Sequence, residues 1–187
     1  MIVVAELHPV KGIDRAIEVF RRVRLALAED LKLYIVGAGP QETALRRQCD
    51  GLAGVEFMGH LSEEEIQRLM RRCFLQLHLA FFDSNPLSVI EGCAAGLIPL
   101  VSDQTGSTDY LPRECIVPSG SVEMAVHRAL GFCKAGPDGT GTLRRRLQES
   151  VAPFSDRQQM VQSFKRAIEY LANGAPKEFE EQVLLVT

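Results

Sequence analysis

The sequence predicts an α/β fold with a parallel sheet of about six strands and helices on both faces. Short apolar runs of four to seven residues alternate with amphipathic segments of ten to eighteen residues, and the alternation occurs six times. Such alternation is typical of parallel sheets, because each parallel connection must cross a face of the sheet. Right-handed crossovers place every strand-to-helix loop at one edge, where ligands of these sheets bind.

In chain order, the apolar run at residues 2–5 is expected to be the first strand. The helix expected over 12–29 carries apolar side chains at three- and four-residue intervals, which gives it one buried face. A strand at 31–36 ends in a Gly-Ala-Gly-Pro turn, and a helix is expected over 41–52. The apolar face of that helix is expected to contain Ala44, Leu45 and Cys49.

A third strand is expected at 55–58, and Ser62 with Glu65 forms a capping box that starts a helix running to about Cys73. The apolar run that follows predicts a strand at 74–80. The remaining predictions are strands at 97–102 and 115–117, helices at 122–134, 142–152 and 155–172, and a flexible connection over 135–141.

Composition excludes several classes of protein. The net charge of −3 is spread over mixed-sign segments, so nothing resembles the basic stripe of a nucleic-acid-binding protein. We expect the arginine run at 144–146 to lie on a solvated helix face. The longest apolar stretch, 73–82, is interrupted by Gln76 and His78 and is too short for a membrane span. We expect a buried strand there.

The five cysteines and four histidines lack metal-ligand spacing, so we expect no metal site. The odd number of cysteines and the missing signal peptide favour a reducing compartment. We expect a cytoplasmic location, with the cytoplasmic face of a membrane as the alternative.

The segment at 81–96 contains the strongest candidate site. Asp83 lies in a loop that Asn85 and Pro86 separate from a short helical pattern, and Glu91 lies inside that pattern. The first-turn amides of residues 87–89 lack helical partners and favour an anion. A sugar diphosphate fits anion donors between two carboxylates, whereas ordinary helix-start chemistry with a solvated Glu91 is the alternative.

Five motifs in order resemble the carboxyl-terminal, donor-binding domain of family 4 retaining glycosyltransferases, which is one Rossmann-like half of a GT-B fold. The resemblance covers residues 1–172 and leaves 173–187 as a tail. The motifs are Leu7-x3-Lys11-Gly12-Ile13-Asp14, Val36-Gly37-x-Gly39-Pro40-x4-Leu45, Val55-Glu56-Phe57-x-Gly59, Asp83-x7-Glu91 and Ala94-Ala95-Gly96-Leu97-Ile98-Pro99.

The resemblance implies a nucleotide sugar as substrate, with no cofactor or required metal, and transfer with retained anomeric configuration. Lys11 matches the basic residue that contacts the diphosphate, Asp83 the carboxylate that contacts the transferred sugar, and Glu91 the one that accepts hydrogen bonds from the ribose. The other implied donor-binding residues are Gly12, Gly39, Asn85, Leu87 and Ser88, with Met58, Gly59, His60 and Leu61 as the loop that reads the base.

The chain departs from the family pattern at Glu6, which stands where the family commonly has an arginine. Asp83 replaces the usual glutamate with a shorter acid. The stretch 149–156 and the pair Leu77-His78 are similar to mannosyltransferases that build lipid-linked oligosaccharides, which suggests GDP-mannose. We otherwise interpret His60, His78 and the cysteines as packing or surface residues.

We therefore expect a glycosyltransferase donor domain that requires an amino-terminal acceptor domain, in the same longer chain or as a separate subunit. Its acceptor would be a membrane-associated lipid or a polysaccharide. One alternative is an inactive nucleotide-binding or interaction module, as Glu6 and Asp83 would indicate. Another is a GT-B epimerase that isomerises a free nucleotide sugar.

Overall fold

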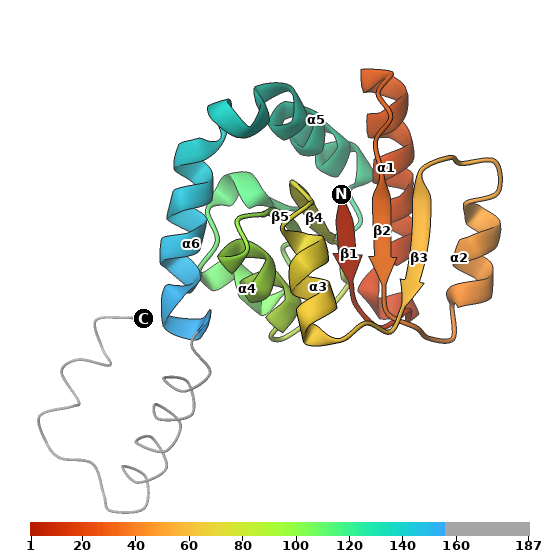
Figure 1. Cartoon of the computed structure of the whole chain (residues 1–187), viewed down its shortest axis with the longest axis horizontal. Coiled ribbons are helices and arrows are strands. Elements are labelled where there is room, and N and C mark those ends of the chain that lie inside the picture. The colour runs from red at the N-terminus through yellow and green to blue at the C-terminus, as the bar shows by residue number, and fades with distance from the viewer. Residues whose placement is uncertain (156–187) are drawn as a thin grey trace, which may run out of the picture. The chain divides into compact units, whose positions relative to one another are not determined.

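The computed structural model describes residues 1–155, and the central element of these is a parallel six-stranded sheet (Figure 1). The strand order is β3-β2-β1-β4-β5-β6, which is the order of dinucleotide-binding Rossmann folds. The predicted α/β fold is therefore confirmed. The strands are β1 (Ile2–Val4), β2 (Leu33–Val36), β3 (Val55–Gly59), β4 (Leu75–His78), β5 (Ile98–Ser102) and β6 (Ile116–Val117).

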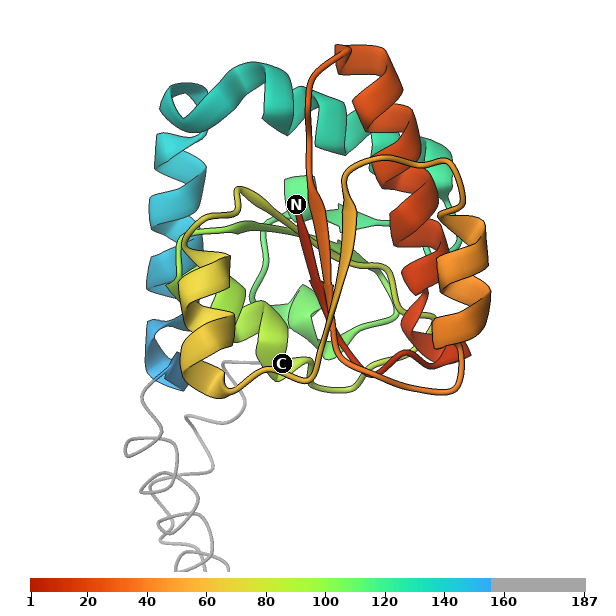
Figure 2. The same ribbon diagram turned by 45° about the vertical axis from the view of Figure 1, so that its right-hand side comes forward.

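Helices cover both faces of the sheet, as Figure 2 shows. On one face, α1 packs against α5 and α2, and on the other α3 and α4 lie over the central strands. The helices are α1 (Ile13–Leu27), α2 (Glu42–Gln48), α3 (Glu63–Met70), α4 (Leu87–Ala94), α5 (Val122–Gly139) and α6 (Gly141–Ser155). Because every connection crosses a face, all loops that follow strands lie at one edge.

The core forms as two apolar layers, one on each side of the sheet. Under α1, the inward residues Ile13, Ile17 and Phe20 are fully buried against Ile35 and Leu77 of the strands. The opposite layer joins α3 to the sheet through residues Ile2, Val36, Leu69, Met70 and Leu97. The three- and four-residue spacing in α1 therefore predicts its buried face correctly.

Two helices, α2 and α3, are shorter than the sequence pattern predicts. The capping box is confirmed, since the Ser62 side chain accepts from the Glu65 amide and the Glu65 carboxylate accepts from the Ser62 amide. However, α3 ends at Met70, and α2 ends at Gln48 instead of near residue 52. The assignment of Ala44 to the apolar face of α2 is wrong, since Ala44 is exposed. This helix has only seven residues, and Leu45 is the one that it buries.

The apolar run at 73–82 is not a strand throughout. Pairing covers only Leu75–His78, so the chain leaves the sheet after His78, and Phe81 and Phe82 on the following loop are exposed. The flexible connection expected over 135–141 is reduced to a break at one residue: two helical segments of α5 meet at a kink at Gly136, where φ is 65°, and helical structure resumes beyond it. A single left-handed glycine is enough to turn the chain.

α6 begins at Gly141 and continues past Pro153 to Ser155, so the predicted end at 152 is too early. Its Arg144 is not simply solvated, since Nε donates to the carbonyl oxygen of Gly96 at 2.6 Å. One compact unit spans Met1–Val151. The structure describes residues only up to 155. Three predictions therefore lie wholly or almost wholly outside it: the helix at 155–172, the domain boundary at 172 and the tail at 173–187.

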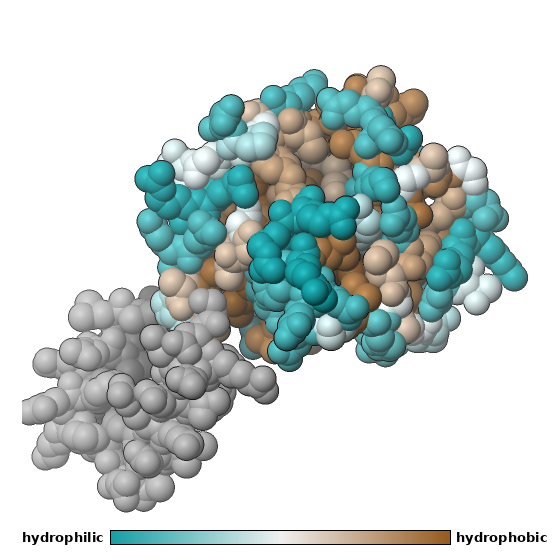
Figure 3. Space-filling model, viewed as in Figure 1, coloured by the Kyte–Doolittle hydropathy of each residue, from teal (hydrophilic) through white to brown (hydrophobic). Residues whose placement is uncertain are grey.

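The surface in Figure 3 is strongly hydrophilic over α3, where Glu63, Glu64, Gln67, Arg68 and Arg71 surround a shallow depression. Acidic and basic side chains mix there, as on an ordinary solvated helix. Among the described residues, no helix combines the length and hydropathy needed to cross a membrane. All five cysteines are free thiols.

Candidate functional site

The loops that follow the strands are joined to one another by main-chain hydrogen bonds along the carboxyl edge of the sheet. Gly37 donates to Gly59 at 2.8 Å and Leu7 donates to Ala38 at 3.0 Å. On the other side of β1, Phe81 donates to Val10 at 2.7 Å, and Asp83 donates to Gln104 at 3.2 Å. The loops that follow β1 to β5 therefore form one continuous edge, as the parallel sheet predicts.

Lys11 and Asp83 meet at the centre of this edge. Lys11 Nζ donates to Asp83 Oδ2 at 2.6 Å, although the two residues are 72 positions apart in the sequence. Lys11 follows β1 and Asp83 follows β4, and these neighbouring strands flank the point where the strand order reverses. Ligands of open α/β sheets bind at such a switch point.

His78 completes a three-residue group with this ion pair. It is the last residue of β4, its side chain is 3% exposed, and its Nε2 lies 3.1 Å from Asp83 Oδ2 without the alignment of a hydrogen bond. The imidazole of His78 is the largest cause that lowers the pKa of Asp83 to about 2, followed among the lowering causes by Lys11. Asp83 is therefore a carboxylate throughout the physiological range.

We expect Asp83→Asn to lower the free energy of unfolding by about 1 to 2 kcal/mol at pH 7. Because the folded pKa of Asp83 is depressed, its contribution is complete above the unfolded pKa of 3.8 and declines as the pH falls toward 2. The full difference in pKa corresponds to about 2.5 kcal/mol, and we reduce this figure because the carboxylate is 14% exposed. Urea unfolding from pH 7 to pH 3 measures the effect.

Asp50→Asn is the matched control, because Asp50 is exposed on the loop after α2 and its carboxylate makes no ion pair within residues 1–155. The difference between Asp83→Asn and the unmodified protein should narrow below pH 4, whereas Asp50→Asn should change little at any pH. A destabilisation of Asp83→Asn that is the same at pH 3 and pH 7 would contradict the electrostatic origin.

His78, which the sequence suggests is a packing or surface residue, is buried and also lies beside the Asp83 carboxylate. The missed signal is the alternation Leu75-Gln76-Leu77-His78 inside a strand expected to be buried. A buried polar side chain needs a partner, so two of them on the same strand face indicate a polar function for that face. Gln76 is the second, and its Nε2 donates to the carbonyl oxygen of Ser88 at 2.9 Å.

The loop that carries Lys11 is held against β4 by Gly12 and Arg15. Gly12 has φ 64° and lies so close to Leu79 that a Cβ atom would overlap the Leu79 carbonyl oxygen. Arg15 is 8% exposed, donates from Nη2 to that same oxygen, and places its guanidinium 3.5 Å from the centre of the Phe81 ring. Gly12 therefore has a packing role, and neither contact is visible in the sequence pattern.

The start of α4 supplies free donors beside Asp83. The main-chain N–H groups of Leu87 and Ser88 make no hydrogen bond within residues 1–155, whereas that of Val89 donates to Pro86 at 2.9 Å. Two of the three expected amides are thus available. Asn85 is exposed on the same loop, and Pro86 is the residue before the first turn.

Glu91 lies on α4, where burial chiefly raises the pKa of its carboxyl group, with Glu63 as a second cause. Within the described chain its side chain makes no hydrogen bond or ion pair. The structure therefore brings Lys11 and Asp83 together, places the α4 amides shortly after Asp83 in the chain, and gives Glu91 no polar contact with the ion pair. Its predicted ribose contact stays a prediction.

The loop predicted to read the base lies on the other side of β1. His60 and Leu61 line a cavity of about 300 Å³ at the ends of β1, β2 and β3, together with Glu6, Gly37 and Ala38. Met58 and Gly59 are the last residues of β3. Gly39 packs against the Leu7 backbone, which leaves no room for a Cβ atom, so close packing explains this glycine.

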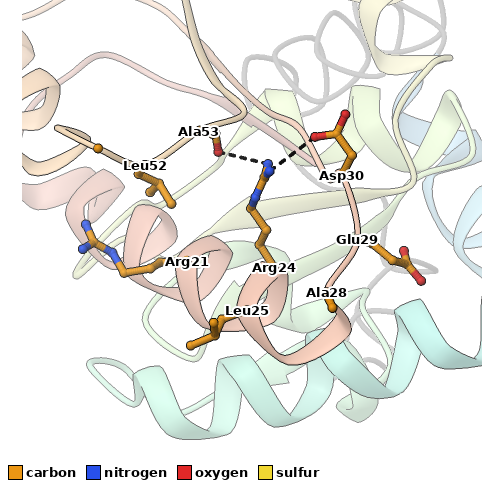
Figure 4. A pocket seen from close by; sticks show the side chains of 9 residues that line it. Arg21, Arg24, Leu25, Ala28, Glu29, Asp30, Leu52 and Ala53 are labelled. Carbon is orange, nitrogen blue, oxygen red and sulfur yellow. Dashed lines mark hydrogen bonds and ion pairs between the residues drawn. The ribbon is translucent and has the colours of Figure 1, made fainter.

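A wider depression of about 730 Å³ lies at the opposite edge of the sheet (Figure 4). It is lined by the end of α1 and by the loops that precede β2 and β3. The Arg24 guanidinium in this depression donates hydrogen bonds to the carbonyl oxygens of Leu31 and Ala53 and to the carboxylate of Asp30. Arg24 therefore holds together the loops that precede β2 and β3. Among residues 1–155, no cluster of three His, Cys, Asp or Glu side chains is placed to hold a metal ion.

The strand order and the charged group at the switch point define a Rossmann-like α/β domain with a ligand edge. The profile of the family described as "Glycosyl transferases group 1" matches residues 1–133, and the chain belongs to this family. A search of curated proteins found no significant match.

Solved glycosyltransferase structures share the fold. The catalytic domain of cholesterol-α-glucosyltransferase from Helicobacter pylori has a TM-score of 0.72 and 17% identity, covering 82% of this chain and 98% of that one. HepE of Anabaena in complex with UDP-glucose has a TM-score of 0.78 and 17% identity, covering 90% and 48%. The pneumococcal O-GlcNAc transferase GtfA with UDP and GlcNAc has a TM-score of 0.72 and 18% identity, covering 91% and 35%. This chain thus spans less than half of the latter two.

Proposed function

We propose that this chain is the carboxyl-terminal, donor-binding half of a family 4 retaining glycosyltransferase and that it binds a nucleotide sugar at the carboxyl edge of the sheet. The observation that carries the proposal is the Lys11–Asp83 ion pair at the switch point, followed in the chain by the two free amides that start α4. Both features suit a diphosphate, since a cation and a helix N-terminus attract phosphate oxygens.

The proposed role of these groups depends on where negative charge develops during sugar transfer. When the sugar leaves, negative charge accumulates on the departing diphosphate, and fixed positive groups stabilise it. In this proposal the ammonium of Lys11 and the N–H groups of Leu87 and Ser88 supply that stabilisation. The protein groups named here suffice for this role, so we propose that transfer requires no metal or cofactor.

Asp83 is proposed to face the transferred sugar and to position Lys11. Its carboxylate is ionised at neutral pH because of His78 and Lys11, so it can accept hydrogen bonds from sugar hydroxyl groups. Its remaining lone pairs would serve the sugar while Oδ2 holds Lys11. Glu91 is proposed to accept hydrogen bonds from the ribose once a ligand occupies the edge.

The acceptor is proposed to bind to a second domain. The structures of HepE and GtfA contain more than twice the length that this chain matches, which leaves room for such a domain. We propose that the 187-residue chain binds donor but transfers no sugar when alone. GDP-mannose is the proposed donor and a membrane-associated lipid or polysaccharide the proposed acceptor, at the cytoplasmic face of a membrane.

Calorimetric titration of the 187-residue chain with GDP, UDP and ADP, with GMP as the control for the second phosphate, tests the proposal. We expect one diphosphate to bind at micromolar to low-millimolar strength and its monophosphate to bind more weakly. Absence of binding by every diphosphate would refute donor binding by this chain. Sugar transfer by the chain without any partner would refute the proposed division of labour between two domains.

One observation favours a second candidate, a binding module that has lost donor affinity. Asp83 already neutralises Lys11, and Glu6 adds a carboxylate at the same edge. A diphosphate would have to compete with Asp83 for the ammonium. The same titration separates the candidates, because the inactive module predicts no diphosphate binding at millimolar concentration.

A further inference from the structure

Glu6 is one of the residues that line the cavity of about 300 Å³ at the ends of β1, β2 and β3. The residue is exposed, and within residues 1–155 its side chain makes no hydrogen bond or ion pair. The cavity volume is at the lower end of the range for small-molecule sites, about 300 to 1,000 Å³. A carboxylate in such a cavity is free to accept hydrogen bonds from a ligand.

The other groups that line this cavity suit a flat ring with polar edges. The main-chain N–H groups of Ala38, His60 and Leu61 make no hydrogen bond within the described chain and are therefore available donors. Apolar side chains provide walls for the faces of a ring; they are Val4, Val36, Leu61 and Ile66. The cavity thus combines apolar walls, main-chain donors and one strong acceptor.

We propose that this cavity selects guanine and that Glu6 is the residue that reads the base; the proposal rests on the proposed binding of a nucleotide sugar. Guanine presents one carbonyl oxygen and then two adjacent donors, the ring N1–H and the 2-amino group. A carboxylate accepts both donors with its two oxygens, as it does from the fork of an arginine. A main-chain N–H of the cavity then donates to the carbonyl oxygen.

The other common bases match the cavity less well. Uracil places its single ring N–H between two carbonyl oxygens, which a carboxylate repels. Adenine offers one amino group beside ring nitrogens that are themselves acceptors. Glu6 therefore adds a favourable contact for guanine and an unfavourable one for uracil, and both raise the difference in affinity between the two bases.

The position of Glu6 in the fold agrees with a base on one side of β1 and a diphosphate on the other. Glu6 and Lys11 belong to the same loop after β1. The cavity is lined by residues at the ends of β2 and β3, whereas Lys11 pairs with Asp83 after β4. The diphosphate would thus meet Lys11 and the α4 amides, and the base would meet Glu6.

The test is a calorimetric titration of the 187-residue chain and its Glu6→Gln variant with GDP, UDP, ADP and inosine diphosphate. Inosine diphosphate lacks only the 2-amino group of guanine, and all four ligands share the diphosphate. We expect GDP to bind at least about tenfold more tightly than UDP, ADP or inosine diphosphate, as a charge-assisted hydrogen bond allows. Glu29→Gln, at the opposite edge, is the control for the change in net charge.

Glu6→Gln should weaken GDP about tenfold and bring GDP and inosine diphosphate to nearly equal affinity, while Glu29→Gln should leave the preference unchanged. If UDP binds as tightly as GDP, or if Glu6→Gln retains the preference for GDP over inosine diphosphate, the base assignment is wrong while donor binding stands. If no diphosphate binds to the unmodified chain, both proposals fail.

Discussion

Lys11→Ala is expected to weaken the binding of a nucleoside diphosphate by roughly 10- to 100-fold and to leave binding of the nucleoside nearly unchanged. A hydrogen bond to a charged group contributes about 1.5 to 3 kcal/mol, which corresponds to this range of affinity. The ammonium of Lys11 is half-buried beside Asp83 at the switch point, so its loss removes the cation at the centre of the edge. Calorimetric titration measures both ligands.

Two further variants distinguish a phosphate contact from a general loss of the site. Lys11→Arg retains the positive charge and should retain much of the diphosphate affinity. Glu91→Ala should weaken the nucleoside and the diphosphate alike, because its proposed contact is with the ribose. Lys32→Ala removes a cation that pairs with Glu56 at the far end of β2 and serves as the charge control. Equal losses of both ligands in Lys11→Ala would show that Lys11 does not contact the phosphates.

Gly12→Ala is expected to lower the free energy of unfolding by about 3 kcal/mol or more, which is exceptional for a single methyl group. The left-handed backbone at φ 64° costs an alanine about 1 to 2 kcal/mol. The added Cβ would also overlap the Leu79 carbonyl oxygen, which cannot withdraw without disturbing β4 and the Arg15 contact. Urea unfolding at pH 7 measures the change.

Gly51→Ala is the matched control for the backbone cost. Gly51 has φ 73°, but no atom lies within 4 Å of the position that its Cβ would take. We therefore expect only about 1 to 2 kcal/mol of destabilisation there. If the two variants lose the same stability, the close approach of Gly12 to Leu79 contributes nothing, and the packing explanation for this glycine is incorrect.

The sequence predicts some features of the helices and strands well and others poorly. The periodicity of α1 predicts its buried face, and the Ser62 capping box predicts the start of α3, because both signals lie within a few residues. The ends of α2 and β4 could not be predicted from the sequence, since they depend on where each element stops packing or pairing with the rest of the sheet. The apolar residues Phe81 and Phe82 look like strand residues and are exposed on the loop.

Local patterns are sufficient to predict the α/β class, the edge of the sheet where the strand-to-helix loops gather, and Asp83 as a candidate residue, because each depends on neighbouring residues and on general rules of parallel sheets. The resemblance to a known family added Lys11. Only the tertiary structure could bring Lys11, His78 and Asp83 together, bury Arg15 against Leu79, and place Glu6 in a cavity with His60. These contacts join segments that are far apart in the chain. They form when the sheet assembles in the order β3-β2-β1-β4-β5-β6.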